Sequence, residues 1–168
     1  MSWSGLILPL ITAFPLAAAQ MAPQANSTFA QEMVAAHNAI RADVGVPPLT
    51  WNPVLADEAQ SWARSLMMRR TFEHSLSRDR HGEGENLVAV YGEAVGEQVL
   101  TNRWTVEKAS YAYGPLHCDE SFHTIGHYTQ MVWKSTTSVG CGLATDGHDQ
   151  VMVCRYAPAG NICGERPY

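Results

Sequence analysis

Two cysteines placed symmetrically about a turn are the strongest constraint on the fold of this chain. Cys141 and Cys154 are equally far from the point between Gly147 and His148, and a glycine followed by one further residue is a good two-residue hairpin loop. In a non-hydrogen-bonded pair of such a hairpin the Cα atoms lie roughly 4.5 Å apart, a distance that a disulfide spans. The pattern predicts an antiparallel hairpin closed by a Cys141–Cys154 bridge.

Neither face of this hairpin is clearly polar, so we expect the sheet to be covered by helices on both sides. The small residues of the second face would let a helix lie close to the strands. These features predict an α+β fold, a three-layer α-β-α sandwich with a central antiparallel sheet. One face carries Val139, Cys141 and Leu143 against Met152, Cys154 and Tyr156, and the other carries Gly140, Gly142 and Ala144 against Val151 and Val153.

The rest of the chain supplies the helices of this sandwich. Apolar residues recur at helical spacing over 28–44, and Asn52 is placed to cap a second helix that starts at Pro53 and carries its apolar stripe through Leu66. We also expect a strand over 86–91, helices over 94–108 and 125–133, and an irregular aromatic loop over 109–123.

The first 19 residues have the pattern of a secretory signal. An apolar run over residues 6–16 is too short and too proline-broken to span a membrane, and it leads into Ala17-Ala18-Ala19, a small-residue cleavage pattern. We expect cleavage after Ala19, a flexible lead over 20–27 and one domain over 28–168. Asn26 in the lead is a glycosylation acceptor if the host is eukaryotic. The protein is predicted to be secreted, or periplasmic in a bacterium.

Composition narrows the class of partner. Four cysteines in the last third of the chain fit an oxidising compartment, and after Cys141–Cys154 the remaining pair gives a second predicted disulfide, Cys118–Cys163. No CxxC spacing is present, which argues against a zinc–thiolate cluster. The net charge is −5 without a cluster of Lys and Arg, so nucleic acid is not an expected partner.

Two sequence blocks near the C-terminus resemble a known family. Residues 126–133 read GHYTQMVW and residues 153–161 read VCRYAPAGN. In this order and near this separation, they resemble the paired signatures of the CAP superfamily (cysteine-rich secretory proteins, antigen 5, pathogenesis-related 1). The resemblance covers about residues 30–168 and implies a single SCP-like, PR-1-like extracellular domain with the α-β-α fold expected above.

The resemblance also implies a cleft of two histidines and two glutamates. The family positions correspond here to His74, Glu85, Glu107 and His127, and all four residue types match. In relatives the two histidines hold a divalent metal, often zinc, so we expect His74 and His127 to bind Zn²⁺ weakly and reversibly. A histidine in the first turn of a helix faces the positive end of the dipole, which favours the neutral imidazole that a metal accepts.

From the residues alone, a hydrogen-bonded structural cluster is a better supported interpretation of this tetrad than a metal site. The ligands lie far apart in sequence and there is no HExxH spacing. Of the other histidines, His37 lies on the apolar stripe of the first helix, where we expect a buried side chain bonded to the backbone.

The aromatic loop offers a binding site for lipids. In CAP relatives from fungi a loop at this place binds sterols, and other members hold fatty acids between helices. By this resemblance Tyr111, Tyr113, Leu116 and Phe122 would form a lid over an apolar pocket. The alternative is that these rings pack on the body of the domain.

We therefore expect a secreted, monomeric, non-catalytic protein that binds sterols or fatty acids and acts at a membrane or host surface. No catalytic residue is assigned, because there is no GxSxG nucleophile motif and all four cysteines are expected in disulfides. The alternative is a metal-dependent hydrolase or protease that uses the His/Glu tetrad and a metal-bound water.

Overall fold

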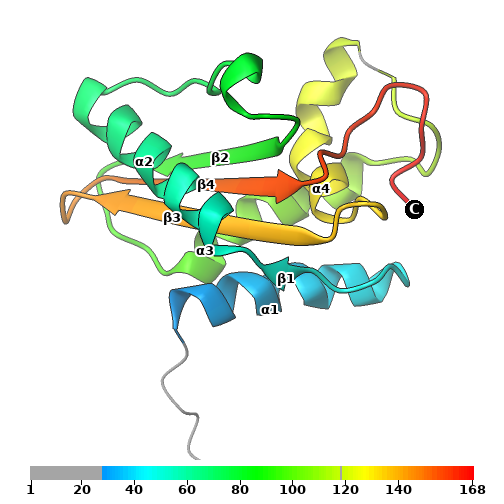
Figure 1. Cartoon of the computed structure of the whole chain (residues 1–168), viewed down its shortest axis with the longest axis horizontal. Helices are drawn as coiled ribbons and strands as arrows, with labels where there is room; N and C mark the ends of the chain where they lie inside the picture. The colour runs from blue at the N-terminus through cyan, green and yellow to red at the C-terminus, as the bar shows by residue number, and fades with distance from the viewer. Residues whose placement is uncertain (1–27, 118) are drawn as a thin grey trace, which may run out of the picture.

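The central sheet has four strands in the order β1-β3-β4-β2 and lies between two layers of helices (Figure 1). This is a computed structural model, and it describes residues 28–117 and 119–168. The predicted signal segment 1–19, the lead with Asn26 and Cys118 lie outside the described residues. The elements are α1 (Phe29–Asp43), β1 (Thr50–Trp51), α2 (Pro53–Arg69), β2 (Gly84–Val90), α3 (Glu97–Thr105), α4 (Gly126–Met131), β3 (Ser138–Thr145) and β4 (Gln150–Ala157), with 3₁₀ turns at Ser77–Asp79, Val106–Ser110 and Glu120–Thr124.

The two long helices begin where their capping residues place them. Thr28 forms a capping box with Gln31 at the start of α1. Asn52 accepts hydrogen bonds from the amides of Val54 and Leu55 at the start of α2. Both starts agree with the sequence-based prediction.

The hairpin of β3 and β4 has the predicted register. Cys141 pairs directly with Cys154, their Cα atoms are 4.0 Å apart, and the disulfide between them is formed. The predicted two-residue loop is wrong in length, because β3 ends at Thr145 and β4 begins at Gln150. The Asp146 carboxylate accepts the amides at positions 148 and 149, which stabilises a wider turn about the same centre. The Cys118–Cys163 bridge stays a prediction.

Helix α2 covers one face of the sheet at close range. A Cβ at Gly140 or Gly142 would collide with the backbone of Ala56 or Gln60 in α2, so the absence of side chains on these strand positions allows the approach. The apolar residues of this layer are Ala59, Ala63, Leu66, Leu87, Ala144, Val151 and Val153. The prediction that small residues admit a close helix is confirmed.

Helices α1, α3 and α4 cover the other face, which holds the larger core. This layer includes Met33, Val88, Leu100, Trp104, Met131, Val139, Met152, Tyr156 and the disulfide. The third helix is shorter than predicted: Gly96 caps it, and the chain tightens into the 3₁₀ turn Val106–Ser110. Strand β2 starts earlier than predicted, at Gly84, because its first residues pair with the end of β4. Within the described part of the chain, no helix is long and apolar enough to cross a membrane.

Candidate His/Glu cleft

The four residues of the predicted tetrad form two histidine–carboxylate pairs. His74 lies in the segment after α2, and its Nδ1 is 2.8 Å from Oε1 of Glu85, the second residue of β2. His127 is the second residue of α4, and its Nδ1 is 2.6 Å from Oε1 of Glu107. Each predicted histidine therefore has one of the predicted carboxylates as its hydrogen-bond partner.

Glu85 is fully buried and is surrounded by donors. Its side chain is 0% exposed. Ser75 donates its amide to Oε1 at 3.0 Å and its hydroxyl to Oε2 at 2.7 Å, and the Arg155 guanidinium adds positive charge, with Nε 3.0 Å from Oε2. Burial by itself would raise the pKa of Glu85, but the hydrogen bonds from His74 and Ser75 and the Arg155 charge outweigh it. The pKa lies below its ordinary value, so the carboxylate is ionised.

Glu107 holds the first turn of α4 as well as the imidazole of His127. Its Oε2 accepts the backbone amides of His127 at 2.9 Å and Tyr128 at 3.0 Å. These are two of the amides that a helix leaves without an intrahelical partner at its start. The His127 ring also stacks on Trp104, with 6.0 Å between centroids and 17° between planes. The imidazole is thus fixed both by a carboxylate and by an aromatic face.

Exposure separates the histidines from the carboxylates. The side chains of His74 and His127 are 55% and 32% exposed, whereas those of Glu85 and Glu107 are 0% and 14% exposed. The carboxylates are the more buried partners and contact Nδ1 of each ring. Carboxylates with this relation to histidine orient the ring for a metal on the other nitrogen.

Successive side chains at the start of β2 point to opposite faces of the sheet. Glu85 shares the α2-facing side of the sheet with Arg155, its direct partner on β4. Its neighbour Asn86 points to the other side, where it donates to the His127 carbonyl at 3.1 Å. Within residues 28–117 and 119–168 no group of three or more His, Cys, Asp or Glu side chains gathers around one point.

The predicted lipid-loop residues pack on one another and on the C-terminal residues. Leu116 is buried, at 2% exposure. The Tyr111 ring contacts Tyr128 and Tyr168, and the Tyr113 hydroxyl donates to the carbonyl of Tyr168 at 2.7 Å. Phe122, the remaining member, lies against Gly126 at the start of α4.

Several residues that shape the cleft were missed in the sequence. Ser75, Arg155, Trp104 and Asn86 contact the tetrad, yet each is unremarkable by type and separated in sequence from its partner. Arg155 stands inside the VCRYAPAGN block, but its contact with Glu85 depends on the pairing of β2 with β4. The prediction for His37 is confirmed: it is fully buried, and Nδ1 binds the Met33 carbonyl at 2.7 Å.

An α-β-α sandwich with a disulfide across its central hairpin and two His/Glu pairs, one at the start of β2 and one at the start of α4, defines a recognisable class of domain. The chain matches the family model of the cysteine-rich secretory protein (CAP) family over residues 34–156, a range that includes all four tetrad positions. The protein belongs to the CAP family.

Similar proteins and structures agree with this assignment. The chain is 37% identical to pathogenesis-related protein 1C of Nicotiana tabacum over 140 residues, which cover 82% of this chain and 80% of the tobacco protein. It is 33% identical to pathogenesis-related protein 1 of Arabidopsis thaliana over 95% of this chain and 94% of that protein. Among solved structures, BmVAL-1 has a TM-score of 0.70 at 26% identity, covering 87% of this chain and 85% of that one. NaASP2, solved with Zn²⁺, has a TM-score of 0.71 at 25% identity, covering 82% and 83%.

Proposed function

We propose that this protein is a secreted CAP protein whose His/Glu cleft binds a divalent metal ion weakly and reversibly, with Zn²⁺ as the first choice, and which also holds a small apolar ligand. The cleft histidines His74 and His127 would be the protein ligands, and water would complete the coordination. A bound zinc ion would supply a Lewis acid and an acidified water at that place.

The observation that carries the metal proposal is the pairing of both Nδ1 atoms with carboxylates. An ionised carboxylate only accepts hydrogen bonds, so Nδ1 of each neutral imidazole carries the proton and Nε2 keeps its lone pair. Within the described residues, neither Nε2 has a hydrogen-bond partner in the protein. Two imidazole nitrogens oriented by carboxylates would supply part of the donor set of a weak zinc site, and water would fill the remaining positions. The Zn²⁺ in the NaASP2 structure supports the choice of metal.

A zinc titration by calorimetry or competition with a chromophoric chelator tests this proposal. The double variant His74→Ala, His127→Ala should lose binding while keeping the fold, because the core does not depend on these exposed rings. The matched control is His81→Ala, His148→Ala, which removes two other exposed histidines. Equal zinc binding by the wild type and the cleft double variant would reject the site.

A groove between α1 and α3 supports the apolar-ligand part of the proposal. Its volume is about 430 Å³, and its lining combines small and apolar residues of α1 with short polar residues of α3: Ala35, Ala36, Ala39, Ile40, Gln98, Asn102 and Thr105. Asp43 and Lys108 also line it and form an ion pair of 3.4 Å. The small, apolar wall that α1 supplies would suit a hydrocarbon chain, and an acidic headgroup would compete with Asp43 for Lys108.

Binding assays with labelled fatty acid and labelled sterol distinguish a ligand held in this groove from a ligand held by the aromatic loop. Ala39→Trp should fill the groove and abolish fatty-acid binding, whereas Tyr111→Ala or Tyr113→Ala should weaken sterol binding. None of these changes should alter zinc affinity. The apolar-ligand proposal is wrong if neither lipid binds saturably at micromolar protein.

The hydrolase alternative needs a carboxylate that is free to take a proton from water. Glu85 already accepts one hydrogen bond from His74 and three from Ser75 and Arg80, and Glu107 accepts one from the His127 ring and two from backbone amides. This favours an orienting role for both. Turnover of ester or peptide substrates that Glu85→Gln or Glu107→Gln removes would establish the enzyme instead.

A further inference from the structure

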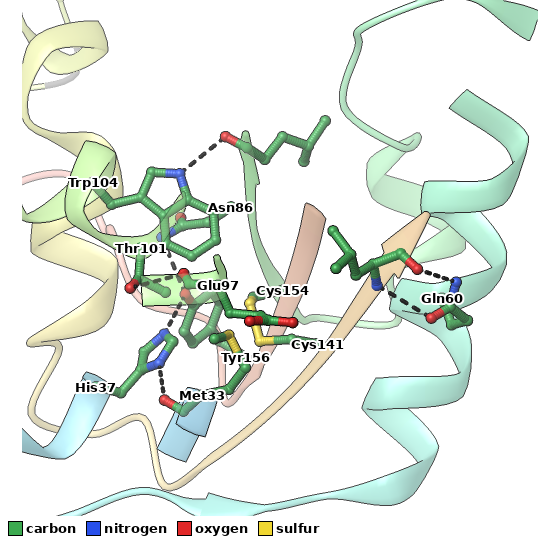
Figure 2. Close-up of a disulfide and its surroundings, with 12 residues drawn as sticks. Met33, His37, Gln60, Asn86, Glu97, Thr101, Trp104, Cys141, Cys154 and Tyr156 are labelled. Atoms are coloured by element: carbon green, nitrogen blue, oxygen red, sulfur yellow. Dashed lines mark hydrogen bonds between the residues drawn. A yellow bond between two sulfur atoms is a disulfide. The ribbon is translucent and has the colours of Figure 1, made fainter. Parts of the chain in front are cut away.

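Four hydrogen bonds run through the core from α1 to the cleft histidine, and Figure 2 shows the part from Met33 to Asn86. His37 Nδ1 lies 2.7 Å from the Met33 carbonyl, and its Nε2 lies 2.9 Å from the Tyr156 hydroxyl. Asn86 Nδ2 lies 3.1 Å from the same hydroxyl and 3.1 Å from the His127 carbonyl. The chain of contacts therefore ends on the main chain of a proposed metal ligand.

The direction of every bond in this chain is fixed by chemistry. A carbonyl only accepts, so His37 carries its proton on Nδ1, and Nε2 of the neutral ring must accept. The Tyr156 hydroxyl therefore donates to His37, and its oxygen accepts one hydrogen from Asn86. The second amide hydrogen of Asn86 goes to the His127 carbonyl. His37 and Tyr156 are 0% exposed and Asn86 is 1% exposed. Loss of one partner would therefore leave a buried polar group without a hydrogen bond, which lowers the stability of the fold.

Asn86 is the sequence neighbour of Glu85, and the two side chains point to opposite faces of β2, as successive strand residues do. Glu85 holds the imidazole of His74 on the α2 side. Asn86 holds the backbone of His127 on the side of α1, α3 and α4. One dipeptide of β2 thus contacts both histidines, one by its ring and the other by its main chain.

We propose that Asn86 is a positioning residue for metal binding, which sets where His127 stands relative to His74. The proposal rests on the proposed zinc function. Glu107 and Trp104 fix the orientation of the His127 ring, and Trp104 also donates to the Leu87 carbonyl of β2 at 3.0 Å. Asn86 ties the His127 main chain itself to β2, at the residue next to the carboxylate that binds His74. Metal sites lose affinity when such supporting contacts are removed, typically tenfold to a hundredfold.

Zinc affinity of full-length Asn86 variants tests the proposal. Asn86→Asp keeps the shape of the side chain and removes the donor hydrogens, and Asn86→Ser keeps a small polar side chain in case the aspartate variant does not fold. Each should bind zinc at least about tenfold more weakly than the wild type. Tyr156→Phe keeps the bond from Asn86 to His127 and should cost clearly less.

The matched control is Gln60→Ala. The Gln60 amide makes two hydrogen bonds to the main chain of Leu143, at 3.0 and 3.1 Å, on the α2 side of the sheet, and Figure 2 shows it apart from the Asn86 chain. Its loss should lower stability without changing zinc affinity. An Asn86 variant that folds and binds zinc as the wild type does, or no more weakly than Gln60→Ala, overturns the proposal.

Hydrogen exchange without metal makes the proposal testable even if the wild type binds no zinc. In Asn86→Ser the amides of His127 and Tyr128, which bind Glu107, should exchange at least about tenfold faster, because the first turn of α4 has lost its anchor. The Gln60→Ala variant should leave these two amides unchanged. Unchanged exchange in the Asn86 variant overturns the positioning role, whereas an absence of zinc binding by the wild type overturns only the proposed function.

Discussion

Arg155 stands directly opposite Glu85 on the β2–β4 ladder, with its Nε 3.0 Å from Oε2 of the carboxylate. This contact is an ion pair and not a hydrogen bond, because the Nε–H group of Arg155 has no aligned acceptor. The side chains are 5% and 0% exposed, so the pair is buried, and Arg80 adds a longer contact of 3.4 Å to the same carboxylate. Arg155 also binds Glu83 at 3.0 Å, which makes it the common cation of two buried carboxylates.

Replacing this arginine is expected to destabilise the protein strongly. Arg155→Met leaves Glu85 without its main counter-charge, and removal of one partner of a buried pair typically costs about 3–5 kcal/mol. Urea unfolding at neutral pH measures the loss. The control is Arg69→Met, which breaks an exposed pair with Glu73 and should cost less than about 1 kcal/mol. Similar losses for the two variants would contradict this prediction.

Stability should fall on acidification because His37 is buried in its neutral form. Burial is the main reason that the pKa of His37 is lowered from its ordinary 6.5 to about 4, and the Arg41 charge acts in the same direction. The unfolded chain binds this proton at a higher pH than the folded protein does. Stability is therefore full above about pH 6.5 and falls by about 3 kcal/mol as the pH drops to about 4.

Unfolding free energies measured across that pH window check the His37 prediction. His37→Gln removes the titrating group, so the variant should be less stable at neutral pH and should lose most of the slope. The exposed histidine variant His148→Ala should keep the slope of the wild type. An unchanged slope in His37→Gln would assign the pH dependence to other groups.

A methyl group on the α2 face of β3 should be poorly tolerated. Gly142→Ala places a Cβ against the backbone of Gln60, so α2 must move away from the sheet, and overpacking of this kind costs about 1–3 kcal/mol or more. Gly96→Ala is the control, because a Cβ there meets nothing within 4 Å. Thermal unfolding should show a lower midpoint for Gly142→Ala alone, and equal midpoints would contradict the close packing.

The hairpin disulfide should contribute to stability through the chain that it closes. Cys141 and Cys154 are separated by 13 positions, and loop-closure entropy for this length corresponds to about 3 kcal/mol. The double variant Cys141→Ala, Cys154→Ala should lose roughly that amount in denaturant unfolding. Peptide mapping without reduction shows which cysteines are joined in the wild type, and a 118–141 link would refute the pairing.

The sequence predicted those parts of the fold that depend on local patterns. The helical spacing of apolar residues over 28–44, the cap at Asn52 and the symmetry of Cys141 and Cys154 placed two helices and the hairpin before any contact was known. The two-residue strand β1 was missed, because its parallel pairing with β3 leaves no periodicity in so short a segment. The third helix was predicted too long because the apolar spacing continues past Thr105, where the backbone changes to a 3₁₀ turn.

The candidate site was predicted by residue type but not by its partners. The two histidines and two glutamates came from the resemblance to the CAP family. The roles of Ser75, Asn86 and Arg155 depend on the register of β2 against β4, which has no signal in either strand alone. The aromatic loop shows the same limit, because its contacts with Tyr168 join segments that only the folded chain brings together.

The opposite orientations of Glu85 and Asn86 have a consequence for how the protein reaches its native sheet. The disulfide fixes β3 against β4, but β2 is an edge strand whose alignment rests on side chains. A slip by one residue would turn every side chain of β2 to the other face. The Glu85 carboxylate would then enter the apolar layer around Met152 and Tyr156, while Arg155 would face an amide. Such a misaligned sheet carries an unpaired buried charge and is strongly disfavoured. The residues that shape the cleft therefore also select the correct register of β2.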